Sequence, residues 1–390
     1  MSKLEELIKE LCPNGVEYIE LKQLSEIGTG KSNRQDALEN GIYPFYVRSK
    51  DTLRINSFEF DEEAIIIPGE GGIGEIFHYV NGKYALHQRA YRIHVFSKKL
   101  NTKFLYYYMR QNFKQFIYMK AVNATVTSIR KPMIEQFKVP VPPMEVQCEI
   151  VRILDNFTEL TAELTAELTA RQKQYEYYRD QLLTFDDSVP RYCIKDVTNK
   201  IVDGSHNPPK PTLSGETIPM ISAKNINNGM IDFVDARPLS ISDYEQENKR
   251  TNVSIGDILL TIVGAIGRVA VVENNLKVVF QRSICVLKPI TSIINSKYFK
   301  YILESSNIQT YINTQASGAA QKGIYLKQVA QVIISVPSVK EQERIVSILD
   351  RFDKLCNDIS EGLPAEIEAR KKQYEYYRDK LLTFKEYENE

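Results

Sequence analysis

The sequence predicts an α+β protein in which two similar globular domains alternate with two long helices. The first observation is a duplication: residues 171–185 (RQKQYEYYRDQLLTF) recur at 370–384 (RKKQYEYYRDKLLTF), identical at 13 of 15 positions. A second pair lies upstream, VPPMEVQCEIVRILDNF at 141–157 and VPSVKEQERIVSILDRF at 336–352. Internal repeats of this kind set the architecture, here globe, helix, globe, helix.

Length and composition agree with two domains in one chain. A chain of 390 residues is long enough for two globular domains and their connectors. No apolar run approaches the ~18 residues of a membrane span, and residues 1–13 lack the layout of a signal peptide. The cysteines are scattered singly, without the spacing of a zinc site or a disulfide framework: Cys12, Cys148, Cys193, Cys285 and Cys356. We therefore expect a reduced, cytoplasmic protein without a membrane partner.

The charge is zero in sum but unevenly distributed. Residues 81–143 hold twelve Lys or Arg and one acid, Glu135, and residues 265–340 hold nine basic residues against Glu273 and Glu304. The segments that follow, 144–170 and 341–369, are acidic. Basic globes joined by acidic helices suggest polyanion binding on the globes and protein contacts on the helices.

The first globe is predicted to span residues 1–143. Its β-branched, alternating runs are bounded by Gly and Pro, and one helix is expected late in the globe, near NTKFLYYYM at 101–109. The triple tyrosine of this helix (Tyr106, Tyr107 and Tyr108) is expected to pack in the core rather than stack on bases.

The first long helix is predicted within residues 144–187. Apolar residues step by alternating four and three from Ile150 to Leu182, which is a heptad seam interrupted only at Thr161 and Arg171. Residues 158–170 also repeat a four-residue unit, TELTAELTAELTA.

The second globe, 188–338, repeats the first more faintly. AIIIPGEGGIG at 64–74 matches DILLTIVGAIG at 257–267, and NTKFLYYYM at 101–109 matches NSKYFKYIL at 295–303. In both globes a Gln-Arg pair, Gln88-Arg89 or Gln281-Arg282, follows the last glycine of this match by fourteen residues. The globes are therefore expected to share one α+β plan.

The second helical segment, 339–390, repeats the seam of the first. Gly362-Leu363-Pro364 should end one helix and start the next, with Gly beyond one end and Pro in the following first turn. Because the first helix leads into the second globe and the second leads back, the two are expected to pair antiparallel about a pseudo-twofold axis, with the termini close together. The residues expected to make this pairing, or to dock partners, are Leu154, Phe157, Tyr175, Tyr178, Leu182, Leu349, Phe352, Tyr374, Tyr377 and Leu381.

Taken together, these features resemble the specificity subunit of a type I restriction–modification system. The resemblance covers the whole chain; the paired YEYYRD-LLTF helices are its most specific part, and the repeat at 158–170 is similar to the TAEL repeats of the type IC branch. It implies that each globe is a target-recognition domain for half of a bipartite, asymmetric DNA sequence. It also implies that the helices set the spacer and dock two methyltransferase subunits, which restriction/translocase subunits join. S-adenosylmethionine, ATP and Mg²⁺ would then act on those partners, with no catalysis, cofactor or metal in this chain.

Individual DNA contacts are predicted from residue type and loop position. Phosphate contacts should come from the basic stretches, and base contacts from Arg, Lys, Asn, Gln and small polar residues on loops. The candidates of the first globe are Arg48, Lys50, Gln88, Arg89, Thr125, Thr127, Arg130 and Lys131. Those of the second are Ser205, His206, Lys224, Asn225, Gln281, Arg282, Gln321, Lys322 and Tyr325. A solvated surface role remains an alternative for each, and the Gln-Arg pairs could instead support a shared turn.

Several catalytic motifs fail on inspection. Gly69, Gly71 and Gly74 satisfy G-x-G-x-x-G, but an alternating, strand-like stretch follows where a phosphate-binding helix is required. Asn207-Pro208-Pro209 is followed by Lys210, not by the aromatic residue that would stack on a flipped base. The four histidines are not spaced as metal ligands. A self-sufficient DNA-modification enzyme, a coiled-coil adaptor without sequence preference and a silent recombination donor remain alternative interpretations.

Overall fold

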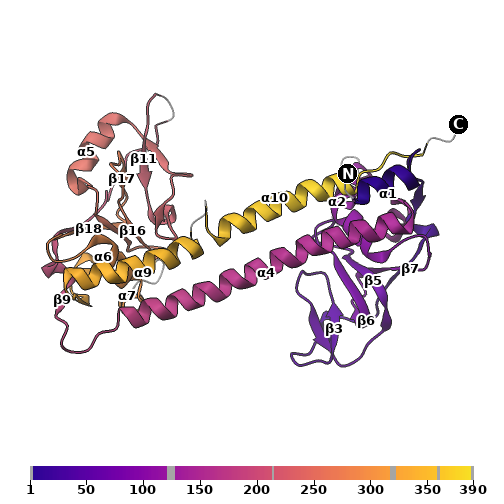
Figure 1. Cartoon of the computed structure of the whole chain (residues 1–390), viewed down its shortest axis with the longest axis horizontal. Coiled ribbons are helices and arrows are strands. Elements are labelled where there is room, and N and C mark those ends of the chain that lie inside the picture. Colours follow the sequence, from indigo (N-terminus) through magenta and orange to yellow (C-terminus); the bar gives the residue numbers. More distant parts are fainter. Residues whose placement is uncertain (1–2, 121–127, 213–214, 317–321, 358–360, 388–390) are drawn as a thin grey trace. The chain divides into compact units, whose positions relative to one another are not determined.

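The structure is a computed structural model of the chain and describes residues 3–120, 128–212, 215–316, 322–357 and 361–387 (Figure 1). The chain forms two compact units: unit 1 is Met1–Glu163 with Glu368–Glu390, and unit 2 is Leu164–Ile367. The long helix α4 (Met144–Leu182) contributes residues to both units, as does α10 (Leu363–Leu381). None of the helices, within the described ranges, is long and apolar enough to cross a membrane.

Unit 1 is built on a six-stranded sheet in the order β2-β7-β5-β6-β3-β4, with a separate two-stranded pair, β1-β8. Its strands are β1 (Tyr18–Glu20), β2 (Ser25–Thr29), β3 (Tyr43–Tyr46), β4 (Leu53–Ile55), β5 (Phe60–Pro68), β6 (His78–Leu86), β7 (Ala90–Val95) and β8 (Lys138–Pro140). Its helices are α1 (Lys3–Leu11), η1 (Leu21–Gln23), η2 (Arg34–Asp36), α2 (Thr102–Lys120) and α3 (Lys131–Glu135), with parts of α4 and α10.

Strand β5 shows that the sheet of unit 1 packs apolar side chains on both of its faces. Side chains alternate between the faces of a strand. Ile65 and Ile67 belong to the main core, which includes α2 and the first turns of α4, whereas Ala64 and Ile66 pack with Tyr84 on the opposite face. A strand covered on both faces reads as the continuous apolar run seen in the sequence.

Unit 2 is built on a four-stranded sheet, β10-β18-β15-β16, a three-stranded sheet, β14-β11-β17, and the pairs β12-β13 and β19-β9. Its strands are β9 (Arg191–Cys193), β10 (Thr198–Asp203), β11 (Ile218–Ile221), β12 (Ile226–Asn227), β13 (Met230–Ile231), β14 (Arg237–Leu239), β15 (Ile258–Thr261), β16 (Val269–Val271), β17 (Val279–Phe280), β18 (Ile284–Pro289) and β19 (Ile333–Ser335). Its helices are η3 (Ile194–Asp196), η4 (Ala223–Asn225), α5 (Ile241–Thr251), α6 (Ser296–Glu304), α7 (Ser306–Gln315), α8 (Leu326–Ala330) and α9 (Val339–Asn357), with parts of α4 and α10.

The second unit repeats the plan of the first, which confirms the predicted pair of similar α+β domains. Strand β15 alternates as β5 does, with Ile258 and Leu260 in one core and Leu259 in another. Each unit also has one parallel pairing: β3 with β6 within the six-stranded sheet of unit 1, and β11 with β17 within the three-stranded sheet of unit 2. On its other edge, β3 pairs antiparallel with β4, and β11 pairs antiparallel with β14.

Two glycines mark the same close approach of the backbone in the two units. A Cβ added to Gly30 would lie 1.8 Å from the carbonyl oxygen of Leu86, and one added to Gly204 would lie 2.1 Å from that of Phe280. No side chain fits at such distances, so only glycine allows these segments to pass. Next to them, Ser32 bridges to His87 and Ser205 to Gln281, both in parallel register.

A buried glutamine joins each globe to its long helix. The Gln147 side chain on α4 accepts from the backbone N–H of Asn101 at 2.8 Å and donates to the carbonyls of Lys99 and Pro142 at 2.7 Å each. On α9, Gln342 accepts from the N–H of Asn295 and donates to the carbonyls of Ile293 and Pro337. Gln342 is the residue of the second repeat that is equivalent to Gln147, so the same junction is built twice.

Aromatic stacking pairs helices within each unit. In unit 1, Phe157 of α4 stacks on Tyr377 of α10 with ring centroids 5.6 Å apart. In unit 2, Tyr178 of α4 stacks on Phe352 of α9 at 5.8 Å. In the duplication, Phe157 is equivalent to Phe352 and Tyr178 to Tyr377. The two contacts are therefore the same contact with the repeats exchanged.

Helix direction follows from the packing inside each unit. In unit 1, α4 begins at the globe and α10 ends there, with Leu382 and Phe384 packed in or on the main core. In unit 2, α4 ends at the globe and α9 begins there. Within each unit the paired helices are thus antiparallel. The terminal segments also meet in unit 1, where Val16 bridges to Glu386.

The structure adds elements that the repeats did not predict. Unit 2 has an additional helix, α5, capped at its start by the Ser240 hydroxyl, which accepts from the N–H of Asp243. The single late helix expected in unit 2 is divided at Ser305 into α6 and α7. The predicted break at Gly362-Leu363-Pro364 is confirmed, because α9 ends at Asn357 and α10 begins at Leu363.

Candidate nucleic-acid interface

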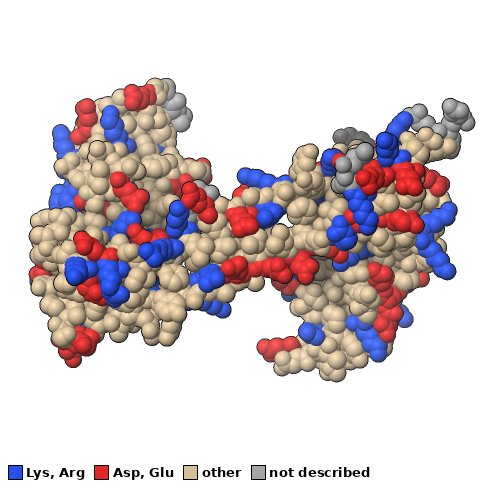
Figure 2. All heavy atoms as spheres, viewed as in Figure 1, with Lys and Arg blue, Asp and Glu red and all other residues tan. Residues whose placement is uncertain are grey.

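Many basic side chains of unit 1 are paired with acids, so its free positive charge is smaller than the sequence count suggests. Lys103 lies 2.7 Å from Asp155, Lys114 lies 2.6 Å from Glu75, and Lys131 lies 3.7 Å from Glu135. Figure 2 shows basic and acidic side chains interspersed over the face in view. The surface available to DNA must therefore be located residue by residue.

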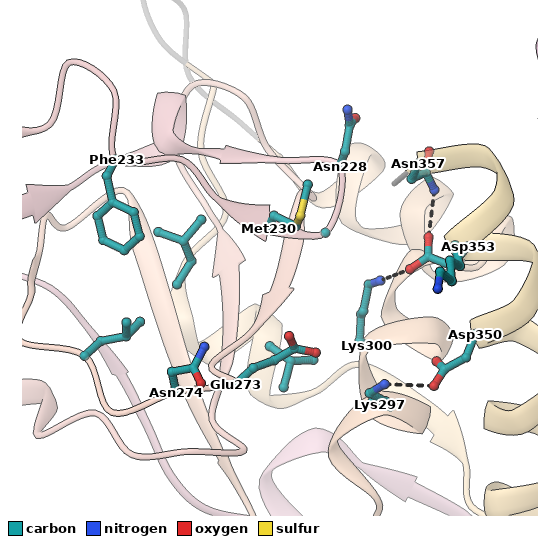
Figure 3. A pocket seen from close by; sticks show the side chains of 15 residues that line it. Asn228, Met230, Phe233, Glu273, Asn274, Lys297, Lys300, Asp350, Asp353 and Asn357 are labelled. Carbon is teal, nitrogen blue, oxygen red and sulfur yellow. Dashed lines mark hydrogen bonds and ion pairs between the residues drawn. The ribbon is translucent and has the colours of Figure 1, made fainter. Parts of the chain in front are cut away.

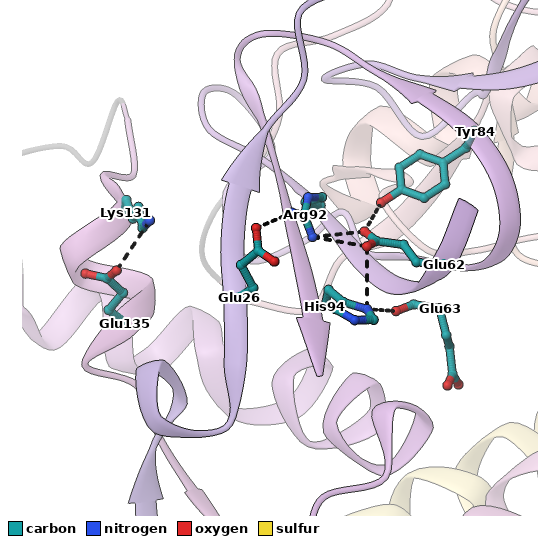
Figure 4. Close-up of polar contacts among 8 residues, drawn as sticks. All are labelled: Glu26, Glu62, Glu63, Tyr84, Arg92, His94, Lys131 and Glu135. Carbon is teal, nitrogen blue, oxygen red and sulfur yellow. Dashed lines mark hydrogen bonds and ion pairs between the residues drawn. The ribbon is translucent and has the colours of Figure 1, made fainter. Parts of the chain in front are cut away.

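Arg92 is one basic residue withdrawn from the surface. Its guanidinium, only 10% exposed, pairs with Glu62 at 3.0 Å and also with Glu26, so that three neighbouring strands are tied together (Figure 4). Tyr84 donates its hydroxyl to Glu62 at 2.8 Å, and burial together with this carboxylate raises the pKa of Tyr84. A buried, paired arginine of this kind is part of the fold rather than a DNA contact.

Two of the predicted DNA contacts of unit 1 converge on one carboxylate. Arg48 follows β3 and Arg89 lies in the turn between β6 and β7; their guanidinium groups lie 2.7 and 3.2 Å from the same oxygen of Glu70. All three side chains are more than a third exposed. Arg48 and Glu70 line a hollow of about 280 Å³ together with Arg34, Val47, Ser49, Gly71 and His87.

The buried side chain of His87 holds the turn that carries Arg89. The buried imidazole accepts the backbone N–H of Arg89 at 3.0 Å, and burial together with the charges of Arg48 and Arg89 lowers the pKa of His87. The ring is therefore held neutral under Arg89. Its neighbour Gln88 donates to the side chain of Asn33 at 2.6 Å, which supports the alternative interpretation of Gln88 as a turn residue.

Other candidates of unit 1 lie near or outside this cluster. The backbone of Ser128 forms an antiparallel β-bridge with that of Glu70, and Ile129 donates its N–H to the carbonyl of Gly69. Arg130, which follows, and Lys50 are exposed. Thr125 and Thr127 lie outside the described residues.

In unit 2, several candidates serve the fold. Asn225 is buried and donates to the carbonyls of Asp232 and Val234, and Ser205 is buried beside Gln281. His206 contacts Asp203 at 2.7 Å, and Arg250 pairs with the same carboxylate. These side chains are already engaged in contacts within the unit.

The remaining candidates of unit 2 are exposed. Lys224 reaches the carbonyl of Asp235 at 2.8 Å. Arg282 and Lys322 are exposed, and Tyr325 presents 72% of its surface. Within the described part of the chain, no acid forms an ion pair with Arg282. Gln281 accepts from the Ser283 hydroxyl, and Gln321 lies outside the described residues.

The predicted helix-pairing residues differ in how far they are buried. Leu154 and Leu349 are fully buried in the two main cores, and Tyr175 is nearly so; the partly buried residues packed against those cores are Leu182, Phe352, Tyr374 and Leu381. Phe157 is partly buried and stacks on Tyr377. Tyr178 and Tyr377 keep 41% and 37% of their surface exposed. Tyr178 and Tyr377 are therefore partly available to a partner.

A cavity of about 660 Å³ lies between the β12–β13 hairpin and helices α6 and α9 of unit 2. Figure 3 shows Met230 and Phe233 on one side and two ion pairs on the other. Lys297 binds Asp350 at 2.8 Å and Lys300 binds Asp353 at 2.9 Å, while Asn357 donates to Asp353. Burial lowers the pKa of Lys300, but Glu304 and Asp353 outweigh it and hold this pKa above its usual value. These pairs attach α6 to α9, as Lys103 and Asp155 attach α2 to α4.

Sequence reasoning missed the residues that position the globes. Tyr107 donates to Asp155 at 2.6 Å in unit 1, and Tyr301 donates to Asp350 at 2.6 Å in unit 2. The sequence did contain a signal for these pairs, because the tyrosine and the aspartate occur at matching positions of both repeats. Glu70 was also missed. Tyr107 and Tyr108 are buried and Tyr106 packs on the main core, in agreement with the predicted structural role of all three.

No three His, Cys, Asp or Glu side chains within the described ranges lie together as a metal site. The G-x-G-x-x-G stretch forms the turn between β5 and β6, with Gly71, Gly72 and Gly74 at positive φ. The chain runs from this turn directly into a strand, so the predicted turn is confirmed and the segment has no phosphate-binding helix.

Comparisons with known proteins match this architecture. A family model described as type I restriction modification DNA specificity domain matches residues 13–171 and again 188–369. A putative type I restriction enzyme specificity subunit of Haemophilus influenzae is 30% identical over 391 residues, covering 94% of this chain and 96% of that protein. The specificity subunit of a type I restriction enzyme of Escherichia coli is 34% identical over 266 residues, covering 64% of each chain.

A solved structure shares the fold. The S subunit of a type I restriction-modification system from M. genitalium superposes with a TM-score of 0.59 at 15% identity, covering 94% of this chain and 96% of that one. At this identity the likeness shows the fold alone.

Proposed function

We propose that this chain, which belongs to the family of type I restriction-modification DNA specificity proteins, binds a bipartite, asymmetric DNA target with one half-site for each globe. The recognition domains would span residues 1–143 and 188–338, and the helical segments 144–187 and 339–390 would set the spacer. The TAEL-like repeat at 158–170 supports placing the chain in the type IC branch of the family, which carries such repeats.

One observation carries this proposal above the others. Both units repeat matching strand pairings, the same glutamine junction and the same exchanged aromatic contact, yet side chains at matching loop positions differ. Arg48 and Glu70 of unit 1 correspond to Ala223 and Val263 of unit 2. A repeated scaffold with different surface residues suits two readers of different base sequences.

The chain would supply recognition, and its partners would supply catalysis. We infer that the helical segments dock two methyltransferase subunits, with exposed Tyr177, Tyr178, Tyr376 and Tyr377 as candidate contacts. Restriction/translocase subunits would join that core. S-adenosylmethionine, ATP and Mg²⁺ would then be bound by these subunits, which act with this chain on cytoplasmic DNA.

The candidate contacts divide into two kinds. Exposed lysines and arginines that form no ion pair with another described residue suit phosphate contacts; among them are Lys50, Arg130, Arg282 and Lys322. Arg48 and Arg89, held by Glu70, suit base contacts. Tyr325 is exposed enough to lie against the sugar-phosphate backbone or a base. Thr125, Thr127 and Gln321 remain predictions from the sequence.

The test is to map modified adenines by single-molecule sequencing in cells that carry this chain and its methyltransferase partner. A two-part motif with a fixed, non-specific spacer supports the proposal. Transfer of radiolabel from S-adenosylmethionine by the purified chain alone would instead identify a self-sufficient enzyme. Equal competition by specific and random duplexes at fixed salt would identify a non-specific adaptor.

A further inference from the structure

In unit 1, Arg48, Glu70 and Arg89 form a three-residue group at the junction of three chain segments. Arg48, which precedes Glu70 in the chain, and Arg89, which follows it, both bind the same carboxylate oxygen of Glu70. Their side chains are 43% and 57% exposed. Arg48 follows β3, Glu70 follows β5, and Arg89 precedes β7. The second oxygen of Glu70 has no ion pair among the described residues.

Phosphate binding alone does not explain this arrangement. A carboxylate between two arginines reduces the positive charge that attracts phosphate, and it would repel an approaching phosphate oxygen. Nor does stability explain it, because ion pairs this exposed contribute little to folding. What the carboxylate does provide is orientation, since it holds two flexible guanidinium groups at a defined place beside a free acceptor.

The backbone that carries the group is the same in both units. Glu70 pairs with Ser128 in unit 1, and Val263 pairs with Gly323 in unit 2, both in antiparallel register. The residues that correspond to Arg48, Glu70 and Arg89 are Ala223, Val263 and Arg282. Only one member of the group is therefore present in unit 2. Positions that keep their backbone and change their side chains are where two readers of different sequences should differ.

The chemistry of the group matches one base pair. In the major groove guanine presents two acceptors, N7 and O6, and cytosine presents the N4 amino donor. Arginine donates to the guanine acceptors, and a carboxylate accepts from the cytosine amino group. An arginine and an adjacent carboxylate can therefore satisfy both partners of a G·C pair at once.

We propose that Arg48, Arg89 and Glu70 read a G·C base pair in the half-site bound by unit 1. One arginine donates to guanine, Glu70 accepts from the cytosine N4 amino group, and the other arginine holds Glu70 in place. Unit 2 has Ala223 and Val263 at the positions of Arg48 and Glu70, so it does not recognise a G·C pair in this way. This inference rests on the proposed function and adds to it a specific base pair and the residues that select it.

The test uses the full-length chain in its assembled complex and duplexes in which each position of the mapped target is changed in turn. For the wild-type complex, replacing the G·C pair read by this group should weaken binding roughly 5- to 150-fold, the range expected for one good bidentate contact. Arg48→Ala and Glu70→Gln should each remove most of that discrimination at the same position of the same half-site. The other half-site should be unchanged.

Matched variants separate base reading from general effects. Glu39→Gln makes the same charge change at an exposed site of unit 1 outside the group and should leave all preferences intact. Uniform weakening at every position, with a shallower salt dependence, would show that the arginines contact phosphate and would overturn the inference. Unchanged preference in Glu70→Gln and Arg48→Ala, with the two-part target intact, would also overturn it. A wild-type complex without any sequence preference would instead refute the proposed function itself.

Discussion

Gln147 and Gln342 perform the same task in the two units, and both side chains are fully buried. Each amide accepts one backbone N–H from the segment before the late helix and donates to two carbonyls. Both glutamines make all three bonds to backbone groups of their own globe or of the segment leading into the long helix. The glutamine therefore fixes how the long helix leaves its globe.

Replacing Gln147 by Ala should destabilise unit 1 by about 1–3 kcal/mol, because buried backbone groups lose their partners. Chemical denaturation followed by circular dichroism measures the change. The control is Gln181→Ala on the exposed face of the same helix, which should shift the midpoint little. Equal midpoints for the two variants would contradict the role of the junction.

Glu304 makes unit 2 sensitive to pH in a way that unit 1 is not. Burial raises the pKa of Glu304 to about 7, with Lys300 and Arg179 acting against the rise and Asp353 adding to it. The equivalent residue of unit 1 is Arg110. An acid whose folded pKa lies above its unfolded value loses a proton on unfolding, so its contribution to stability falls as pH rises from about 4.5 to 7.

Glu304→Gln should therefore be more stable than the wild-type chain at pH 8, by about 1–3 kcal/mol, and nearly equal to it at pH 5. Denaturation of both proteins at a series of pH values gives the difference directly. His87 of unit 1 acts in the opposite sense, because its lowered pKa removes stability as pH falls, but it is common to both proteins. A difference that does not vary with pH would contradict the assignment.

Residue roles divide into those that the sequence could predict and those that it could not. The Gln-Arg pairs were found from their spacing, because the same spacing recurs in both globes. Glu70 was not found, because Arg48 and Arg89 meet it only after three strands are aligned. Asn225 was proposed as a DNA contact but is buried by a local turn that no repeat indicated.

At the scale of elements, the aromatic residues near the helix ends divide into packed and exposed members. Tyr377 stacks on Phe157, whereas Tyr376 presents 64% of its surface. Tyr177 and Tyr178 divide in the same way, with Tyr178 stacked on Phe352. The duplicated YEYY sequence therefore provides both an intramolecular contact and a surface for a partner.

Tyr377→Ala should lower the stability of unit 1 by about 1 kcal/mol, because it removes an aromatic pair and its buried area. Tyr376→Ala should leave stability nearly unchanged and should weaken binding of the methyltransferase subunit if that face docks it. Thermal denaturation and co-purification measure the two effects. The reverse pattern would contradict the division between packed and exposed tyrosines.

The repeat within α4 suggests how the spacer is set. Deleting Thr161–Leu164 removes four helical residues, about 6 Å of length and a rotation of about 40° beyond one turn. One base pair of DNA advances ~3.4 Å and turns roughly 35°. We expect the deletion to shorten the non-specific spacer by one base pair and to leave both half-sites intact. Mapping of methylated sites that revealed an altered half-site would reject this.

The helical elements were more predictable than the sheets. The seam was visible because apolar spacing is local, and Leu164, Leu168 and Arg171 are indeed less exposed than their neighbours. Helix α5 was not predicted, because it has no counterpart in the first globe and its sequence, ISDYEQENKRT, has little apolar periodicity. The pairing order of the sheets depends on contacts between distant segments that short repeats do not specify.

At the scale of the whole molecule, one chain contains two copies of a recognition unit with different surfaces. The symmetry is carried by Phe157 with Tyr377 and by Tyr178 with Phe352, each pair joining the first repeat to the second. Pairing across repeats makes each unit depend on both halves of the chain, while the globe of each unit remains a continuous segment. If each globe reads DNA as proposed, its base preference should be changeable without disturbing the helices.

The most direct test replaces residues 188–338 with the matching domain of the Haemophilus influenzae relative and maps the methylated sequence before and after. If each globe reads its own half-site, one half of the motif changes while the other half and the spacer stay the same. A motif that changes in both halves, or that is one uninterrupted sequence from the start, would contradict the account.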